Sequence, residues 1–211
     1  MPTIEQARLW YTTADPVHDF EHVLRVYRLA ERIGRAEGAD LDIVRAAALL
    51  HDASGAAPED AAARAGHQYA SADFAAEVLR AEDWPAEKIA AVQHCIRAHR
   101  FRGDEAPQSL EAKIIFDSDK LDVIGAIGVA RVMAYAARAD QPLTGTPSEK
   151  FLRSFEKEPG EPHTPYHEFL FKLARIQDRL HTATARALAA ERHNYLAAYF
   201  ERLAREVAGE A

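Results

Sequence analysis

The seven residues 46–52, Ala-Ala-Ala-Leu-Leu-His-Asp, end an apolar helical run on two adjacent polar side chains, His51 and Asp52. A charged Asp at the end of such a run is costly to bury unless it is paired or bound to a metal. His22 lies upstream in a helical pattern, and Asp119 lies downstream in another. Two imidazoles and two carboxylates make a nitrogen and oxygen ligand set that suits Mn, Fe, Ni, Co or Mg rather than a thiolate type of zinc site. We therefore expect these four side chains to hold one divalent metal ion.

Each of these polar residues also has an explanation without metal. A half-buried histidine such as His22, taken alone, is more often a satisfied core residue than a ligand. The pair His51-Asp52 changes that balance, because two adjacent polar groups at an inward helix end need a common partner. Asp119 in turn lies among apolar residues of its own helix. A shared ion explains all three segments, whereas a purely structural account needs three separate compensations.

Apolar residues recur at intervals of three and four through most of the chain, which is typical of amphipathic helices. Before residue 105, helices are expected in four places: from Asp15-Pro16 to Gly38, from about Asp42 to His51, from near His67 or Ser71, and from Pro85 toward Gly103. Ser109 then precedes a long helical stretch that runs through Met133.

Prolines and glycines interrupt the pattern between residues 139 and 165, where we expect an irregular excursion with one short helix at 149–155. The segment 166–207 is again helical and is expected to break near residues 182–184. Few segments alternate with period two, so the predicted fold class is all-α. A length of 211 residues fits a single-domain helical bundle, with a core over about 15–140 on which the C-terminal helices of residues 166–207 pack.

The composition is that of an ordinary soluble globular protein, with 48% hydrophobic and 28% charged residues. A formal net charge of -7 argues against a broad surface for nucleic acid or anionic membranes, so neither is expected as a partner. The one cysteine, Cys95, cannot form an intramolecular disulfide and is expected to be a small core residue. Without a signal peptide or a long uncharged apolar stretch, the chain is expected to be cytoplasmic.

Four strings of sequence together resemble one protein family. They are His-Asp-Phe-Glu-His-Val-Leu-Arg-Val at 18–26, Leu-Leu-His-Asp at 49–52, Asp-Ser-Asp-Lys-Leu-Asp at 117–122 and Ile-Gly-Ala-Ile-Gly-Val-Ala-Arg at 124–131. In this order they resemble the HD superfamily of metal-dependent phosphohydrolases. The last two strings are most similar to the small bacterial predicted hydrolases that include a nucleotide pyrophosphohydrolase, and residues 172–193 resemble that subfamily as well.

The resemblance implies the ligand set that the polar pattern indicates. By position, the metal ligands of the family are matched by these residues: His22, His51, Asp52 and Asp119. Asp117 competes for the fourth place, and two acids two positions apart in one helix cannot both point at the ion. We choose Asp119, because residues 118–121, Ser-Asp-Lys-Leu, fit the Ala-Asp string of the family with Ser in place of Ala.

The resemblance also implies a role for further histidines. His67 and His99 are expected to face the substrate phosphates or a weaker second ion. His94 lies five residues before His99, which is about 140° out of register on a helix, so both are not expected to bind one ion. His94 is therefore expected to be a solvated helix residue.

Two cations and one acid are the expected substrate-binding and catalytic groups. Arg25 and Lys120 are expected to contact phosphate oxygens, although such side chains are more often solvated surface charges. Lys120 and Asp52 are the expected catalytic residues, with Asp52 acting partly as a base while it ligates the ion. The pair Glu59-Asp60 matches the water-activating acid pair of the family poorly.

The function that this resemblance implies is hydrolysis of a phosphorylated small molecule. The leading hypothesis is a nucleoside triphosphate pyrophosphohydrolase that uses a metal-bound hydroxide. A 5′-nucleotidase and a phosphodiesterase on the same metal site are alternatives, as are a non-enzymatic nucleotide-binding sensor and a di-iron oxygenase. The oligomeric state is left open, and a dimer through the C-terminal helices is one arrangement.

Overall fold

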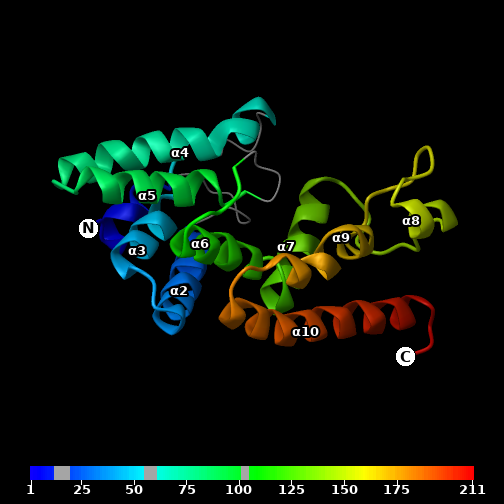
Figure 1. The fold of residues 1–211 in the computed structure, drawn as a ribbon. Coiled ribbons are helices and arrows are strands. Elements are labelled where there is room, and N and C mark those ends of the chain that lie inside the picture. The colour runs from blue at the N-terminus through cyan, green and yellow to red at the C-terminus, as the bar shows by residue number, and fades with distance from the viewer. Residues whose placement is uncertain (12–19, 55–60, 101–104) are drawn as a thin grey trace. The chain divides into compact units, whose positions relative to one another are not determined.

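The computed structural model describes residues 1–11, 20–54, 61–100 and 105–211. Within these residues every regular element is a helix, which confirms the all-α fold class (Figure 1). The chain forms two compact units: unit 1 comprises residues 1–120 and 180–185, and unit 2 comprises residues 121–179 and 186–211. No helix in the described ranges is both long and apolar enough to cross a membrane.

The helices of the described residues are divided between the two units. Unit 1 holds α1 (Ile4–Arg8), α2 (Phe20–Glu37), α3 (Leu41–Leu50), α4 (Ala61–Ala81), α5 (Ala86–Arg97) and nearly all of α6 (Leu110–Leu121). Unit 2 holds α7 (Gly125–Arg138), α8 (Glu149–Ser154), α9 (Pro165–Phe171), the 3-10 turns η1 (Leu173–Arg175) and η2 (Gln177–Arg179), and most of α10 (Ala183–Val207). The expectation that the C-terminal helices pack on a core over residues 15–140 stays a prediction.

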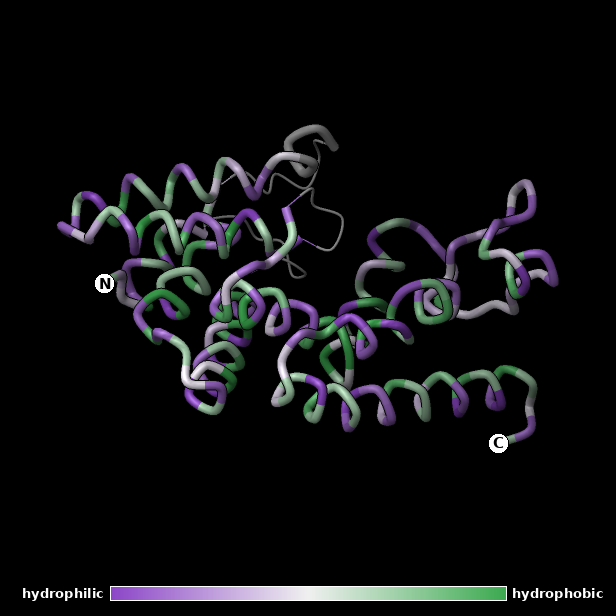
Figure 2. The backbone as a smooth tube through the Cα atoms, in the orientation of Figure 1, coloured by the Kyte–Doolittle hydropathy of each residue, from purple (hydrophilic) through white to green (hydrophobic). Residues whose placement is uncertain are grey.

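Unit 1 is built around α3. Asp40 caps the helix, because its Oδ1 accepts hydrogen bonds from the N–H groups of Asp42 and Ile43. Every side chain from Ala46 to Leu50 is buried, and this half of the helix is drawn in the green of apolar residues in Figure 2. The helix packs against α1, α2, α4 and α5. Because this half of the helix is buried on all sides, the polar pair that follows it is carried inside unit 1.

The second helix turns one apolar face toward this core. Its buried side chains include Val23, Val26, Ala30 and Ile33. His22 lies on the same face, with only 2% of its surface exposed. The helix ends before Gly38, whose φ of 76° is a conformation that glycine adopts without strain, as predicted. The predicted start at Asp15-Pro16 lies outside the described residues.

The start of α4 was predicted too late. The helix begins at Ala61, before the predicted start near His67 or Ser71. Residues 61–65 read Ala-Ala-Ala-Arg-Ala, a run of strong helix formers that carries no apolar periodicity, so intrinsic propensity rather than pattern sets this boundary. Pro85 opens α5 as predicted, and that helix ends at Arg97. The expected continuation toward Gly103 is therefore wrong, because the chain leaves the helix at Ala98, before His99.

The long helix predicted from Ser109 through Met133 is wrong. Ser109 does begin a helix, since its Oγ accepts a hydrogen bond from Ala112 N, but α6 ends at Leu121 and α7 begins at Gly125. Gly125 has a φ of 77°, which breaks the helical path. Arg192 donates a hydrogen bond to Leu121 O and thereby satisfies a carbonyl at the end of α6. The pattern of apolar residues within a helix cannot indicate a hydrogen-bond partner that lies 71 residues away.

The predicted irregular excursion is observed in unit 2. Its one α-helix within residues 139–164 is α8, close to the predicted 149–155, and it ends at Phe155 with a φ of 59°. The break predicted near residues 182–184 is also present, and it is longer than expected. Between α9 and α10 the chain makes the two 3-10 turns of residues 173–179.

The carboxylate of Glu161 holds this excursion together. Its Oε1 accepts hydrogen bonds from Ser148 N at 2.7 Å and from His167 Nε2 at 3.0 Å. Its Oε2 accepts from Ser148 Oγ and from Glu158 N, each at 2.7 Å. The backbone hydrogen bond from Ser148 and the bond from His167 are the main reasons that the pKa of Glu161 falls to about 2. One ionised side chain therefore joins α8, α9 and the loop between them.

The tight turn after α6 leaves no room for a methyl group at Gly128, so we expect Gly128→Ala to be destabilising. A Cβ there would lie 2.4 Å from Val123 O, a backbone atom that cannot move aside. We expect Gly128→Ala to lower the free energy of unfolding by about 2 kcal/mol, or roughly 4–8 °C in melting temperature. Gly66→Ala is the control, because no atom lies within 4 Å of its Cβ position and alanine is the better helix former. Equal stability of the two variants would contradict this account of the turn.

The lowered pKa of Glu161 predicts a pH dependence of stability. A carboxylate whose pKa is lower in the folded state stabilises the fold above the pKa of the unfolded chain, and this contribution is lost as the pH falls toward the folded pKa. Wild type should therefore exceed Glu161→Gln in unfolding free energy at pH 7, and the difference should shrink as the pH falls from 4.5 to about 2. Denaturant unfolding at a series of pH values measures it. A difference that stays constant over this range would show that the ionised form has no special role.

Candidate metal centre

His51 and Asp52 directly follow the last turn of α3. His51 is the C-cap residue of the helix, and none of its surface is exposed. Its Nδ1 donates a hydrogen bond to Ala48 O at 2.9 Å, so Nε2 carries the lone pair. This buried Nε2 has no hydrogen-bond partner among the described residues. Because an unpaired buried polar atom is costly, a cation at this nitrogen fits the structure.

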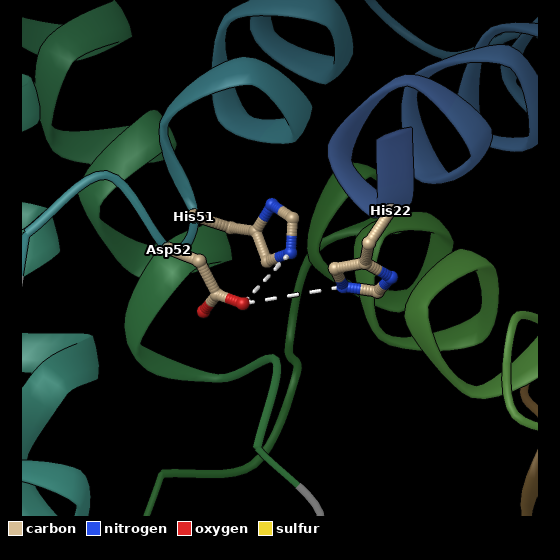
Figure 3. A group of neighbouring side chains, drawn as sticks. All are labelled: His22, His51 and Asp52. Atoms are coloured by element: carbon tan, nitrogen blue, oxygen red, sulfur yellow. Dashed lines mark ion pairs between the residues drawn. The ribbon is translucent and has the colours of Figure 1, made fainter. Parts of the chain in front are cut away.

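The structure brings together all four predicted ligands, which come from α2, the end of α3 and α6. His51 Nε2 lies 3.5 Å from Asp52 Oδ2, and His22 Nε2 lies 4.0 Å from the same oxygen (Figure 3). Asp119 Oδ1 lies 3.4 Å from His22 Nε2. Adjacent ligands of one octahedral ion with bonds of about 2.1 Å are roughly 3 Å apart. The donor atoms are thus near the spacing that a shared divalent ion requires.

Asp117, the alternative fourth ligand, is occupied elsewhere. It is fully buried, and its Oδ1 accepts a hydrogen bond from His181 N at 2.9 Å. Its Oδ2 accepts from Thr182 N at 2.8 Å and from Thr182 Oγ1 at 2.7 Å. Asp117 therefore fixes the chain at residues 181–182, while Asp119 faces His22. This geometry favours the choice of Asp119 made from the sequence.

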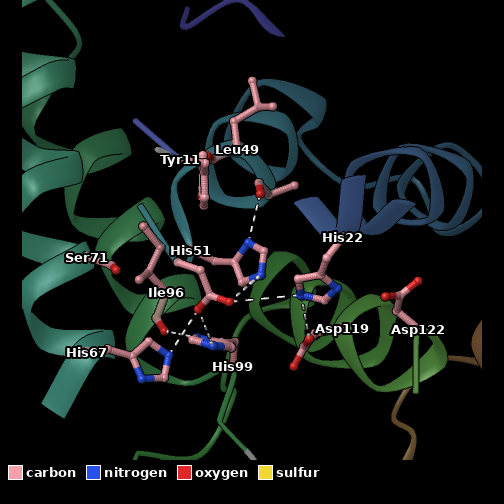
Figure 4. Close-up of polar contacts among 12 residues, drawn as sticks. Tyr11, His22, Leu49, His51, His67, Ser71, Ile96, His99, Asp119 and Asp122 are labelled. Atoms are coloured by element: carbon pink, nitrogen blue, oxygen red, sulfur yellow. Dashed lines mark hydrogen bonds and ion pairs between the residues drawn. The ribbon is translucent and has the colours of Figure 1, made fainter. Parts of the chain in front are cut away.

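A second group of donors meets the other oxygen of Asp52. His67 Nε2 lies 3.0 Å from Asp52 Oδ1, and His99 Nε2 lies 3.5 Å from it (Figure 4). His99 Nδ1 donates to Ile96 O, so its Nε2 is the ring nitrogen that faces Asp52. Asp52, His67 and His99 form a potential metal-binding group, as do His22, His51 and Asp52. Asp52 is common to both groups, with one oxygen facing each.

His94 differs from its prediction. As expected, it does not join His99, but it is not solvated, since only 19% of its side chain is exposed. Its Nδ1 donates to Glu105 Oε1 at 2.6 Å, and its Nε2 accepts a hydrogen bond from Gln108 N at 3.0 Å. His94 thus ties the segment before α6 to α5. Glu105 and Gln108 lie in the connection before α6, so the spacing of residues within one helix could not indicate them as partners of His94.

The protonation states at the centre are those that metal ligands need. Burial lowers the pKa of His51 to about 4, which leaves the imidazole neutral near pH 7. Burial opposes ionisation of Asp52, but His51 together with hydrogen bonds from His67 and His99 holds its pKa well below the usual range. Burial likewise opposes ionisation of Asp119, and Lys120 and His22 hold its pKa low. A neutral His51 and the two ionised carboxylates can bind a cation without first losing protons.

Of the two predicted phosphate-binding cations, one lies at the centre. Lys120 Nζ forms an ion pair with Asp119 Oδ2 and lies 5.3 Å from the centre of the Phe116 ring. Only 11% of its side chain is exposed, so it is not a solvated surface charge. Arg25 is half-buried in α2, and its contact with substrate stays a prediction.

Comparison with known proteins identifies the family. A family model described as the HD domain matches residues 19–124, the range that carries His22, His51, Asp52 and Asp119. The chain belongs to the HD domain family. It is 33% identical over 214 residues to the protein YpgQ of Bacillus subtilis (strain 168), which covers 97% of this chain and 94% of YpgQ.

Solved structures of other HD proteins share the whole fold. A crystal structure of Bacillus subtilis YpgQ in complex with ADP has a TM-score of 0.75 at 31% identity and covers 99% of this chain and 100% of that one. An HD-superfamily hydrolase from Bacillus thuringiensis has a TM-score of 0.70 at 26% identity, covering 96% of this chain and 95% of that one. HD domains bind divalent metal, and this HD-domain chain is a metal-dependent hydrolase, as its sequence predicts.

The sequence did not indicate two hydroxyl groups beside the centre, those of Tyr11 and Ser71. Tyr11 contacts Leu49, 38 residues away, and Ser71 contacts Ser54, 17 residues away. The spacing of residues within one helix cannot indicate contacts between residues so far apart in the sequence. The pair Glu59-Asp60 lies outside the described residues. The Cys95 thiol is buried, as predicted, and burial raises its pKa, so it stays protonated as a small core residue.

Asp117 and Asp119 have different surroundings, so replacement by alanine should affect different properties: stability at Asp117 and metal binding at Asp119. Asp117→Ala leaves the backbone N–H groups of His181 and Thr182 without this acceptor, the second of them buried, and should lower the unfolding free energy by about 3 kcal/mol. Asp119→Ala should stay folded and lose the stabilisation by Mn²⁺, which in wild type reaches about 2.7 kcal/mol at a concentration 100 times Kd. Thermal unfolding with and without Mn²⁺ measures both effects. If Asp117→Ala were instead stable and insensitive to Mn²⁺, Asp117 would be the ligand.

Proposed function

We propose that this HD-domain hydrolase releases pyrophosphate from nucleoside triphosphates at a divalent ion held by His22, His51, Asp52 and Asp119. The observation that carries the proposal is the buried, unpaired Nε2 of His51 next to ionised Asp52. A metal ion can use that lone pair, and burial disfavours a proton there. The nucleotide substrate is supported by the similarity to YpgQ, whose crystal structure contains ADP.

The bound ion would supply a water of lowered pKa and would neutralise charge on a phosphoryl oxygen. The chain supplies the positions. His51 is oriented by Ala48 O and His99 by Ile96 O, so neither imidazole must turn to present its Nε2. Asp52 lies next to both sets of histidines, and its proposed role as a base would be to accept a proton from the attacking water.

Lys120 supplies positive charge for the substrate, and the second histidine group supplies further polar contacts. Lys120 is held next to the centre by Asp119 and by the face of Phe116, so its ammonium can contact a phosphate oxygen without a large change of position. Arg25 is proposed as a further phosphate contact. His67 and His99 either donate hydrogen bonds to phosphate oxygens or hold a weaker second ion with Asp52. The second ion would be weaker because its one carboxylate is shared with the first.

Product analysis tests the reaction. The purified protein is incubated with nucleoside mono-, di- and triphosphates and with Mg²⁺, Mn²⁺, Ni²⁺ or Co²⁺, and the products are separated by ion exchange. We expect nucleoside monophosphate and pyrophosphate in equal amounts from at least one triphosphate. Orthophosphate as the only phosphorus product besides nucleoside would replace this proposal by a 5′-nucleotidase. Cleavage of a diester substrate alone would replace it by a phosphodiesterase.

Variants of the His51-Asp52 pair test whether the centre carries the activity. His51→Ala and Asp52→Ala should lose the bound ion and at least about 10³-fold in kcat/KM, since the ion contributes several kcal/mol to the transition state. His163→Ala is the matched control, because His163 lies in unit 2, outside the centre, and pairs with Glu168. Metal content and turnover are measured on the same samples. Full turnover in either centre variant would overturn the proposed site.

A further inference from the structure

A phenol group contacts the segment that leads into the ligand pair. Tyr11 follows α1, and its ring lies 5.6 Å from that of Phe20, between centroids. Its hydroxyl donates a hydrogen bond to Leu49 O at 2.9 Å, three residues before Asp52. The last carbonyls of a helix have no partner within the helix, so Tyr11 supplies one from a distant part of the chain. Burial, and next the Asp52 carboxylate, raise the pKa of Tyr11 well above its usual value, so the donor proton is retained.

A second hydroxyl contacts the segment that leaves the pair. Ser71 on α4 is fully buried. Its Oγ donates to Ser54 O at 3.1 Å and accepts from Ser54 N at 3.2 Å, so one side chain satisfies both backbone groups of a single residue. Ser54 lies two residues after Asp52, and Ser71 lies one helical turn after His67. Ser71 therefore fixes the path of the chain after Asp52 relative to the helix that carries His67.

Between these contacts the chain has little support of its own. Residues 51–54 lie beyond the end of α3, and the backbone hydrogen bond from Ala53 N to Leu50 O, at 3.2 Å, is a single turn. Asp52 nevertheless needs an accurate position, because its two oxygens face different histidines at 3.0 to 4.0 Å. A carboxylate on a short turn reaches such accuracy only when the surrounding contacts restrain the backbone.

We propose that Tyr11 and Ser71 are positioning residues for Asp52. Their hydroxyls, named here the hydroxyl clamp, hold residues 49–54 before and after the ligand pair and so set the distance from Asp52 to both groups of histidines (Figure 4). Both hydroxyls contact backbone groups, those of Leu49 and Ser54. The clamp acts through the backbone, and its expected effect is on the affinity for the metal. This inference rests on the proposed function, in which Asp52 is a ligand.

Direct titration with Mn²⁺ tests the clamp without any substrate. Tyr11→Phe keeps the ring on Phe20 and removes one oxygen, and Ser71→Ala removes the other. Each variant should stay folded by circular dichroism and should bind Mn²⁺ with a Kd 10- to 100-fold higher than wild type, the range typical of partners that orient metal ligands. Ile33→Val is the control, because it removes a buried methyl group from α2 and weakens the core at a position outside residues 49–54. It should bind Mn²⁺ as wild type does.

The outcomes separate failure of the clamp from failure of the metal site. If wild type binds no Mn²⁺, or if Asp52→Ala binds it as wild type does, the proposed function fails. If wild type binds, Asp52→Ala does not, and a folded Tyr11→Phe or Ser71→Ala keeps the wild-type Kd, that residue has no positioning role. Equal weakening in Ile33→Val would also overturn the clamp, because loss of stability alone would then explain the result. Tyr11→Phe and Ser71→Ala each test the clamp independently. If one of them misfolds, the other still gives a result.

Discussion

The burial of ionisable groups next to one another is the constraint on which unit 1 depends. A core that encloses His22, His51 and Asp52 would be unstable if their lone pairs and charges faced apolar side chains. The structure avoids this by turning the donor atoms toward a common point and by satisfying the remaining ring nitrogens of His51 and His99 with carbonyls of their own helices. The apolar end of α3 and the face of α2 therefore do more than fill space, since they exclude water from a set of groups that is then available to a cation.

Asp52 has the central place in this arrangement. Its two oxygens serve two different sets of imidazoles, so a movement of its backbone would change both sets at once. Because the two oxygens belong to one carboxylate, a cation that draws charge from one oxygen makes the other a weaker metal ligand. The two groups of ligands are therefore coupled electrostatically. Hydroxyl groups contact this part of the chain on either side of Asp52, from Tyr11 after α1 and from Ser71 on α4.

The sequence was sufficient to predict what depends on local pattern. Three helices with polar residues on apolar faces implied that His22, His51 and Asp119 meet, and the strings at 18–26, 49–52 and 117–131 implied the HD fold. Contacts between distant residues were not predictable in this way. The break after Leu121 depends on Arg192, the burial of Asp117 depends on Thr182, and His94 is held by a loop residue, Glu105. The start of α4 was missed for another reason, because its first residues are helical by propensity and not by periodicity.

The attachment of residues 181–182 to Asp117 has a consequence for the order in which the molecule is made. Unit 1 is discontinuous, since residues 180–185 complete it after the intervening 59 residues of unit 2. A nascent chain that has left the ribosome only as far as α6 carries a carboxylate that is destined for the interior but has no donors for it. His181 and Thr182 arrive 64 and 65 residues later. Folding of the metal-bearing unit is therefore completed only after synthesis has passed through unit 2, and the two units cannot mature in simple succession.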